Sequence, residues 1–485
     1  MFVLAIDQGT TNTKALIFDT KGRVCASASR PCSTHYPKPG WAEQSADEIW
    51  STTRAVVEAV LQDFEGEISA LGISNQRETL VVWDAETGAP AGPAPIWQCR
   101  RTAEACAALI DDGLEPEVTA LTGLGINPLF PASKLAWLLK NRPEVAALHA
   151  QGRLRAGTVD AWLIWKLTGG QSFATDRSNA SRTLLFDTEI CAWSARLGEI
   201  FDAPIDCLPK SMASNSAFGL TAAGVTALPA GIPIHAVMGD SHAALYGHGV
   251  RTPGPVKATI GTGSSLMMLT KDRVLSSSGL SSTIAWSIDD DVAYALEGNI
   301  TVSAQAASFT ADLLNIQDVA TLSDMAQSVE DSDGVVFVPA LAGLGAPHWD
   351  DAARGLFSGL SLGTRPEQLA RATFDAILHQ IADVFEALQT DIDGPLSKLQ
   401  TDGGASANAW LVQMLANLLD VPVERRTFAE VGAWGAAALA FEAMGHPVTT
   451  AEAGQESFAP SATAQWRKAM RSNWRAALKK AQCHE

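Results

Sequence analysis

Residues 3–18 read VLAIDQGTTNTKALIF, and residues 256–269 read VKATIGTGSSLMML. Each stretch places a short loop of glycine and threonine between two apolar runs, which is typical of two strands joined by a tight turn. One such hairpin stands in each half of the chain. The repetition predicts two related lobes with a cleft between them, divided near residue 250.

The elements around these hairpins mix strands with helices. In the first half, Ser45 and Glu48 have the spacing of a capping box and open a helix, and an apolar strand follows at 68–74. In the second half, one long helix is expected over 367–389, and a strand, a turn and a helix over 398–419. This alternation predicts an α/β architecture.

The composition is that of a globular protein with an acidic surface. The chain has 485 residues, of which 47% are hydrophobic, and a net charge of −18, which argues against nucleic-acid binding. The seven cysteines form no CxxC pair, so free thiols are expected rather than a zinc site. Neither a basic leader nor a run of about 18 apolar residues is present. We therefore expect a cytoplasmic protein that binds neither nucleic acid nor a membrane.

Three loops could hold a nucleotide. The loop DQGTTNTK (7–14) offers hydroxyls, free backbone N–H groups and Lys14 to phosphate oxygens, although it is not a Walker A loop. GTGSS (261–265) is a second turn of this kind, and TDGGASAN (401–408) carries a double glycine that lets the backbone approach a flat ligand. Each loop alone is compatible with an ordinary turn, and their order along the chain favours phosphate binding.

Two acidic residues stand where apolar runs end. Asp7 follows the first run, and Asp240 follows IPIHAVM and opens the stretch GDSHAALYGHG (239–249). Two carboxylates at strand ends that face a cleft suit Mg²⁺ and a substrate hydroxyl. His242 has the chemistry of a catalytic base, but a structural role is favoured because no acidic partner is visible near it.

A further polar pair and a tryptophan suggest a binding site for hydroxyl groups. Arg77 and Glu78 follow the apolar strand at 68–74 and can hydrogen-bond neighbouring hydroxyls; the alternative is a surface ion pair. Trp97 precedes two arginines and can pack against the C–H face of a polyol, although a core position is the alternative.

Taken together, these segments resemble the FGGY carbohydrate kinases, and within that family most of all the glycerol kinases. The resemblance runs nearly from end to end. It is carried by AIDQGTTNTKALIFD, YPKPGWAEQSADEIW, LGISNQRETLVVWDAETG, IWQCRRTAEAC, GTVDAWLIWKLTGG, SNASRTLLFD, LAGLGAPHWDDAARGLFSGL and DGGASAN, and by the signature-like GLFSGLSLGTRPEQLARATFD.

The resemblance implies two ribonuclease-H-like lobes of the actin-like ATPase type around a central cleft. Residues 1–250 would form the N-terminal lobe, with the acceptor site and the first phosphate loop, and 251–485 the C-terminal lobe, with the nucleotide site. ATP would bind with Mg²⁺ and give its phosphate to a primary hydroxyl of a small polyol or sugar. A homodimer or homotetramer is compatible with the sequence.

The resemblance also assigns roles to individual residues. Asp240 would be the general base, and Asp7 and Asp240 would hold Mg²⁺. The acceptor side would comprise Arg77, Glu78, Trp97, Leu129, Asp240, Ser241 and Ser265. The nucleotide side would comprise Thr10, Thr11, Asn12, Lys14, Thr262, Ala304, Ser308, Gly404 and Asn408.

Several of these positions depart from the glycerol kinase pattern. Leu129 stands where those kinases usually carry Tyr, Ser241 where they carry Gln, and Ser265 where they carry Phe. Ala304 and Ser308 replace Gly and Gln. We expect the small Ser241 and Ser265 to enlarge the acceptor pocket, so that a tetritol, pentitol or pentulose is the alternative to glycerol.

Two further expectations follow from the resemblance. The segment LTAAGVTALPAGIP (220–233) contains no arginine, so control by a sugar bisphosphate is not expected. A non-catalytic, actin-like nucleotide-binding protein is the distant alternative, and the presence of Asp240, Arg77 and Glu78 argues against it.

Overall fold

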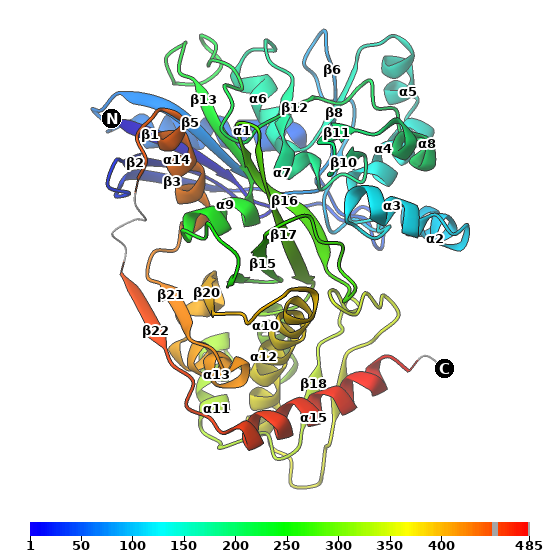
Figure 1. Cartoon of the computed structure of the whole chain (residues 1–485), viewed down its shortest axis with the longest axis vertical. Coiled ribbons are helices and arrows are strands. Elements are labelled where there is room, and N and C mark those ends of the chain that lie inside the picture. The colour runs from blue at the N-terminus through cyan, green and yellow to red at the C-terminus, as the bar shows by residue number, and fades with distance from the viewer. Residues whose placement is uncertain (449–453, 484–485) are drawn as a thin grey trace.

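The computed structural model describes residues 1–448 and 454–483, and it has two α/β lobes stacked along the long axis of the molecule (Figure 1). The sheet of the first lobe has the strand order β13-β5-β1-β2-β3. Strands β1, β2 and β3 form an antiparallel meander, and β5 and β13 run parallel to β1. The bounds are β1 Phe2–Gln8, β2 Asn12–Asp19, β3 Val24–Pro31, β5 Ile68–Asn75 and β13 Ile234–Gly239.

The sheet of the second lobe has the order β16-β17-β15-β14-β20-β21-β22. Its central part, β17-β15-β14-β20-β21, repeats the arrangement of the first sheet, because a hairpin again pairs in parallel with the strands that follow. Two ribonuclease-H-like, actin-like lobes are therefore confirmed. The bounds are β14 Pro255–Ile260, β15 Ser264–Thr270, β16 Ser281–Ile288, β17 Asp291–Ile300, β20 Lys398–Asp402, β21 Val423–Arg426 and β22 Gln455–Phe458.

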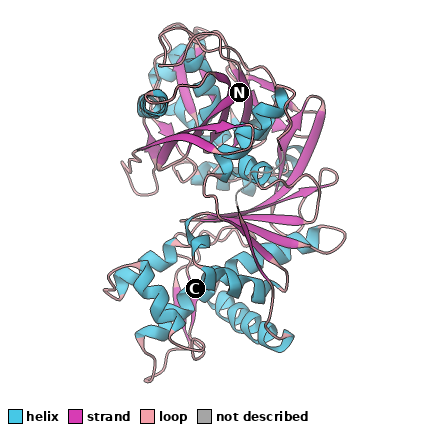
Figure 2. Cartoon of the chain, turned by 90° about the vertical axis from the view of Figure 1, so that its left-hand side faces the viewer, coloured by secondary structure: helices cyan, strands magenta, loops and turns pink. Residues whose placement is uncertain are grey.

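Amphipathic helices cover these sheets, and Figure 2 shows the second sheet between the upper lobe and the helices of the lower lobe. Helix α1 (Ala46–Leu61) starts as expected, because the side chain of Ser45 accepts a hydrogen bond from the Glu48 N–H at 3.3 Å. The Glu48 side chain itself accepts from the Ser33 N–H. The predicted long helix is α12 (Pro366–Asp391), whose apolar face packs into the core of the second lobe.

Helices α9 (Asp240–Gly247) and α14 (Val431–Ala443) cross where the two lobes meet. A Cβ at Gly435 would lie 1.8 Å from the Ala243 carbonyl oxygen, so this close crossing requires glycine. Although α14 belongs to the second half of the chain, it packs against β1, β5 and β13 of the first sheet. The start of α9 is therefore held firmly beside the cleft.

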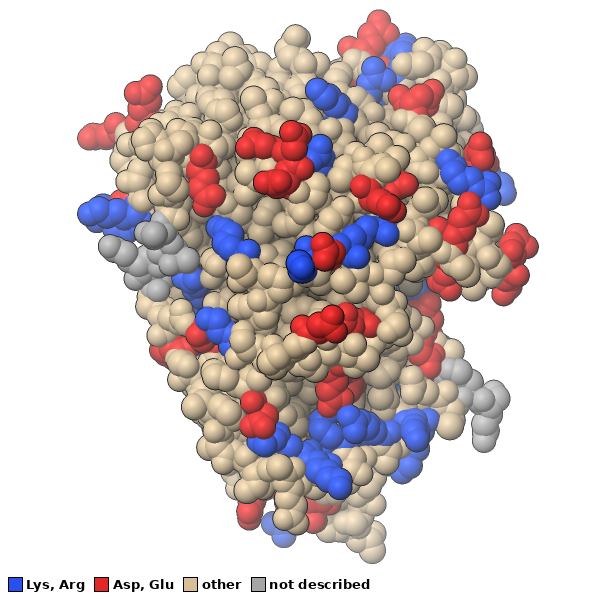
Figure 3. All heavy atoms as spheres, in the orientation of Figure 1, with Lys and Arg blue, Asp and Glu red and all other residues tan. Residues whose placement is uncertain are grey.

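The C-terminal helix α15 (Ala464–Ala481) packs on the second lobe. Trp474 is fully buried, and Arg471 binds Asp383 and Glu386 of α12. Figure 3 shows basic side chains gathered low on this face, and acidic and basic groups interspersed above them. No helix within the described residues has the length and apolar character needed to span a membrane.

The remaining elements complete the two lobes. In the first lobe they are β4 Glu43–Gln44, β6 Val81–Asp84, β7 Ala94–Pro95, α2 Ala103–Asp111, α3 Glu115–Thr122, α4 Pro131–Asn141, α5 Pro143–Ala150, β8 Leu154–Gly157, α6 Val159–Leu167, β9 Ala174–Asp176, α7 Arg177–Ala180, β10 Phe186–Asp187, β11 Ala192–Trp193, α8 Ala195–Phe201 and β12 Lys210–Met212. In the second lobe they are α10 Gln305–Leu313, α11 Val319–Gln327, β18 Val336–Val338, β19 Leu356–Ser358, the 3₁₀ turn η1 Gly404–Ala407 and α13 Ala409–Leu419.

Candidate active site

A cavity of about 330 Å³ lies in the cleft and is lined by residues of both halves of the chain. The predicted residues that line it are Asp7, Thr10, Arg77, Glu78, Trp97, Leu129, Asp240, Ser241 and Ser265. The structure adds lining residues that the sequence did not single out, among them Gln76, Asn299, Thr301, Trp349 and Asp402. Elements far apart in the sequence thus converge on one pocket.

Asp240 stands at the first position of α9, directly after strand β13. Its Oδ1 accepts hydrogen bonds from Arg77 Nε at 3.0 Å and from the Ser241 N–H at 2.6 Å. The helix N-terminus also favours a negative charge at this position. Because both hydrogen bonds use Oδ1 and the side chain is 44% exposed, Oδ2 can accept a proton from a hydroxyl bound in the cavity.

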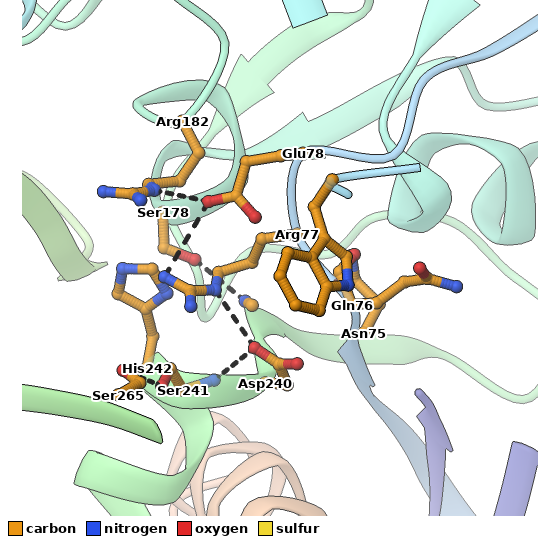
Figure 4. Close-up of polar contacts among 12 residues, drawn as sticks. Asn75, Gln76, Arg77, Glu78, Ser178, Arg182, Asp240, Ser241, His242 and Ser265 are labelled. Carbon is orange, nitrogen blue, oxygen red and sulfur yellow. Dashed lines mark hydrogen bonds and ion pairs between the residues drawn. The ribbon is translucent and has the colours of Figure 1, made fainter. Parts of the chain in front are cut away.

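Arg77 is a buried side chain held between carboxylates (Figure 4). Its NH1 lies 2.7 Å from a carboxylate oxygen of Glu297, but 4.0 Å from Glu78. Burial alone would lower the pKa of Arg77, and Glu297, Glu78 and Asp240 outweigh that effect, so the pKa is raised. The alternative of a surface ion pair between Arg77 and Glu78 is wrong, because these residues are only 8% and 5% exposed.

A second buried arginine completes this network. Arg182 is fully buried and donates from Nε to Glu78 Oε1 at 2.7 Å, and its NH2 lies 3.1 Å from Glu297. Burial acts to raise the pKa of Glu297, but Arg77 and Arg182 hold it well below the usual range, so Glu297 is ionised. Neither Arg182 nor Glu297 was predicted from the sequence as a site residue.

Lys134, in α4, fixes the backbone on the same side of the cavity. Its ammonium group donates to the carbonyls of Glu78 at 2.9 Å and Leu129 at 2.6 Å, and the side chain is fully buried. Burial lowers the pKa of Lys134 to about 7. Glu78 also adopts a left-handed backbone conformation with φ of +62°, which this neighbour helps to hold.

Trp97 contacts the turn between β1 and β2. Its indole Nε1 donates to Thr10 Oγ1 at 3.0 Å, and Thr10 Oγ1 donates to Gln76 Oε1 at 3.3 Å. The polar edge of the indole is thus satisfied within the protein. The ring packs against a small apolar cluster of Ala42, Ile96 and Cys99 and lines the cavity.

The two candidate metal ligands, Asp7 and Asp240, line the same cavity. Burial, with smaller contributions from Asp240 and Glu430, raises the pKa of Asp7 to about 6, against the hydrogen bond from Ser74 and the charge of Lys14. Two neighbouring carboxylates in a partly buried site fit a divalent cation. The described residues contain no group of three or more metal-binding side chains, so water and phosphate oxygens would supply the other ligands.

The two hairpin turns present mainly backbone and exposed side chains. In the first turn, the Gly9 N–H donates to the Asn12 carbonyl at 2.9 Å, and the side chains of Thr11 and Asn12 are exposed. Lys14, predicted to contact phosphate, pairs with Glu430 at 2.7 Å in this structure. In the second turn Thr262 is exposed.

The start of α10 and the double-glycine turn lie beside the second hairpin turn. The Ala304 N–H donates to the Gly261 carbonyl at 3.0 Å, and Ser308 is exposed on α10. A Cβ at Gly403 would lie 2.6 Å from the Ile260 carbonyl oxygen, whereas one at Gly404 would meet open space. The Oδ1 of Asn408, in turn, caps helix α13. None of these residues is among those that line the 330 Å³ cavity.

His242 lies behind this site and not in it. The ring is fully buried, and its Nε2 lies 3.4 Å from Thr283 Oγ1. Burial holds the pKa of His242 well below its usual range, so the ring is neutral. A Cβ at Gly239 would contact both this ring and the Arg77 side chain, so His242 packs against the turn that precedes Asp240. This geometry fits the structural role.

Comparison with known proteins assigns the chain to a family. Models of the N-terminal and C-terminal domains of the FGGY family of carbohydrate kinases match residues 2–247 and 256–444. The chain belongs to this family. A glycerol kinase of Symbiobacterium thermophilum is 45% identical to it over 99% of this chain and 98% of that protein.

Two further members of the FGGY family bear on the site. An apulose kinase of Pectobacterium atrosepticum is 44% identical over 91% of this chain and 90% of that protein. The crystal structure of Plasmodium falciparum glycerol kinase with ADP superposes with a TM-score of 0.92 at 29% identity, and it covers 100% of this chain and 99% of that one. This FGGY kinase therefore shares its whole fold with a solved member, and it is a phosphotransferase.

Proposed function

We propose that this FGGY kinase transfers the γ-phosphate of ATP to a primary hydroxyl of a small polyol or sugar, with Asp240 as the general base. The carrying observation is the Asp240 carboxylate, which is held through Oδ1 by Arg77 and the Ser241 N–H inside a cavity lined by both halves of the chain. In this proposal residues 1–250 supply the acceptor side and 251–485 the nucleotide side.

Phosphoryl transfer requires mainly positioning and charge stabilisation, and the residues of the cavity can provide both. Asp240 Oδ2 accepts the proton of the acceptor hydroxyl as the hydroxyl oxygen attacks the γ-phosphorus. Arg77 fixes the orientation of this carboxylate through the hydrogen bond from Nε. Arg77, Glu78 and the face of Trp97 would hold the rest of the acceptor.

The nucleotide side would bind ATP through the two hairpin turns. Thr10, Thr11, Asn12 and Thr262 would hydrogen-bond the phosphates, and Lys14 would exchange Glu430 for a phosphate oxygen. Ala304, Ser308, Gly404 and Asn408 would lie beside the adenosine. Asp7 and Asp240 would hold Mg²⁺, which neutralises charge on the phosphates when it is bound. The ADP in the Plasmodium falciparum structure supports ATP as the donor.

The names of two relatives indicate the kind of acceptor that this chain could use. Both glycerol, a triol, and apulose, a larger sugar, are phosphorylated by kinases that are 44–45% identical to this chain, as their names state. A small polyhydroxylated acceptor is therefore proposed. A cytoplasmic location is also proposed, and it is supported by the seven free cysteines, which are typical of a reducing compartment.

The test is ADP formation from Mg²⁺-ATP in the presence of a panel of polyols and ketoses from three to five carbons. We expect at least one acceptor to raise the rate of ADP release far above the rate with ATP alone, and mass spectrometry to find the phosphorylated acceptor. If no acceptor in the panel raises the rate, the proposed function is wrong and a non-catalytic nucleotide-binding protein is favoured.

A further inference from the structure

We propose, on the basis of the function proposed above, that Ser241 and Ser265 form a hydroxyl-binding floor in the acceptor cavity, held in place by Lys257. This floor selects polyhydroxylated acceptors of four or five carbons over glycerol. Ser241 and Ser265 determine the specificity, and Lys257 is a positioning residue.

The two serines of the floor are the middle members of a series of four hydrogen-bonded side chains. The Lys257 ammonium group donates to Ser241 Oγ at 2.9 Å, Ser241 Oγ lies 2.8 Å from Ser265 Oγ, and Ser265 Oγ donates to Glu297 Oε1 at 2.7 Å. Lys257 and Glu297 are fully buried, whereas the two serines line the cavity. Both hydroxyls are therefore anchored from behind and face a ligand.

The register of the second sheet explains this arrangement. Lys257 on β14 pairs with Met267 on β15, which in turn pairs with Glu297 on β17. Ser265 precedes Met267 by two residues and points to the same face. Ser241 reaches this face from the first turn of α9, next to Asp240. The floor thus has a fixed position relative to the proposed base.

Lys257 and Glu297, at the two ends of this hydrogen-bonded series, determine which atom donates in each of its hydrogen bonds. Glu297 is an ionised acceptor, so the single hydroxyl proton of Ser265 points to it. In the bond between the two serines, Ser241 must then donate, and Lys257 must donate to Ser241. Each serine oxygen has two lone pairs and uses one of them to accept a hydrogen bond within this series. What remains for a ligand is one accepting position on each serine.

The two free hydrogen-bond-accepting positions, one on each serine oxygen, require hydrogen-bond donors from the substrate. In the proposed function, the reacting hydroxyl binds Asp240 and the neighbouring hydroxyls bind Arg77 and Glu78, so the three hydroxyls of a triol would already be engaged. A further hydroxyl satisfies the floor, whereas a carbonyl oxygen or a methylene group placed there leaves the accepting positions unpaired. The floor therefore favours acceptors with a fourth hydroxyl. In a ketose, the carbonyl group must lie elsewhere in the cavity.

The central experiment compares kcat/KM for glycerol, 1,2,4-butanetriol, erythritol, threitol, the pentitols and the pentuloses with the full-length protein. We expect the best acceptor of four or five carbons to exceed glycerol by about tenfold or more. Because 1,2,4-butanetriol has the chain length of erythritol and lacks one hydroxyl, we expect it to be no better than glycerol. Glycerol as the best acceptor would overturn the inference and leave the proposed kinase function intact.

Two replacements of Ser265 separate hydroxyl binding from pocket size. Ser265→Ala keeps the space and removes the hydroxyl, so we expect kcat/KM for the larger acceptor to fall about tenfold relative to glycerol. Ser265→Phe fills the space and should cause a larger relative loss. Ser51→Ala, at an exposed site on α1, is the matched control. If Ser265→Phe changes the ranking of acceptors and Ser265→Ala does not, the pocket selects by size and the hydroxyl-binding floor is refuted.

Lys257→Met tests the positioning role. We expect KM for the larger acceptor to rise about tenfold with a small change of kcat, because Ser241 loses the donor that orients its hydroxyl while Asp240 remains in place. An equal fall of kcat for every acceptor would show a structural role only. Thermal melting of each variant reports folding, and the Ser265 pair keeps the inference testable if Lys257→Met does not fold.

Discussion

The two sides of the cleft are built differently. On the proposed acceptor side, buried ion pairs support the cavity from behind: Arg77 and Arg182 both bind Glu297, and all three side chains are buried. On the nucleotide side, the predicted contacts are turns in which Thr11 and Thr262 are exposed and a glycine is required. The acceptor side is thus organised by side chains, and the nucleotide side by backbone.

This difference explains where specificity can change. A buried ion network tolerates little substitution, because removing one partner leaves an uncompensated charge. Ser241 and Ser265 carry no charge and lie at the edge of this network, so we expect their substitution to change the choice of acceptor with less effect on stability than substitution of the charged residues. The backbone N–H groups of a turn can bind phosphate whatever its side chains are, so we expect the predicted phosphate contacts to depend less on side-chain identity than the acceptor side does.

The strongest test of the acceptor side is Asp240→Asn. The amide keeps the shape of the side chain but cannot take the hydroxyl proton, so we expect kcat to fall about 10³-fold or more. The affinity for ATP without Mg²⁺, measured by calorimetry, should change little, because Asp240 is not among the residues predicted to contact the nucleotide directly. Turnover near that of the wild type would show that Asp240 is not the base.

The next largest effect is expected for Glu297→Gln. Loss of this charge leaves Arg77 and Arg182 buried without a full counter-charge, so we expect the variant to lose about 3–5 kcal/mol of stability in urea unfolding. Glu117→Gln is the matched control, because its partner Arg196 is 51% exposed and the pair is solvated. That control should unfold like the wild type. If the two variants have equal free energies of unfolding, the buried charge of Glu297 does not stabilise the fold as we expect.

Adjacent glycines test the nucleotide side. Gly403 has a φ of +91° and its Cβ would lie 2.6 Å from the Ile260 carbonyl oxygen, so Gly403→Ala should cost about 1–3 kcal/mol of stability. A Cβ at Gly404 would meet no atom within 4 Å, so Gly404→Ala should melt like the wild type. If the adenosine lies against Gly404, this second variant should raise KM for ATP several-fold. An unchanged KM for ATP would show that the adenosine does not contact Gly404.

Local patterns in the sequence suffice to predict much of this fold. The turn between β1 and β2, the cap at Ser45 and the apolar face of α12 each depend on residues close together in the chain. The shared hairpins then predict two lobes of one topology, and the family resemblance predicts some of the residues that line the cavity, such as Asp240, Arg77 and Trp97.

What the sequence does not predict depends on long-range register. Glu297 reaches Arg77 only because β17 pairs with β15 inside the second sheet, and no local pattern signals that neighbour. Lys257 likewise meets Ser241 only through the meeting of α9 and β14. The packing of α14 on the first sheet is also non-local, and it depends on glycines that allow the close crossing with α9.

The smallest predicted effect concerns Lys134, a buried charge of the acceptor side whose partners are backbone carbonyls. Burial lowers its pKa to about 7, from an ordinary value near 10.5, so the unfolded chain binds more protons than the folded chain between these pH values. The contribution of this group to the free energy of unfolding is therefore fully present above pH 10.5 and is lost as the pH falls through 7. Lys134→Met leaves the carbonyls of Glu78 and Leu129 without this donor and should be less stable throughout. We expect its deficit in melting temperature to be larger at pH 9 than at pH 6. A deficit that does not change with pH would mean that Lys134 stays charged over this range. Its ammonium group would then titrate like that of a lysine on the surface, in spite of its burial.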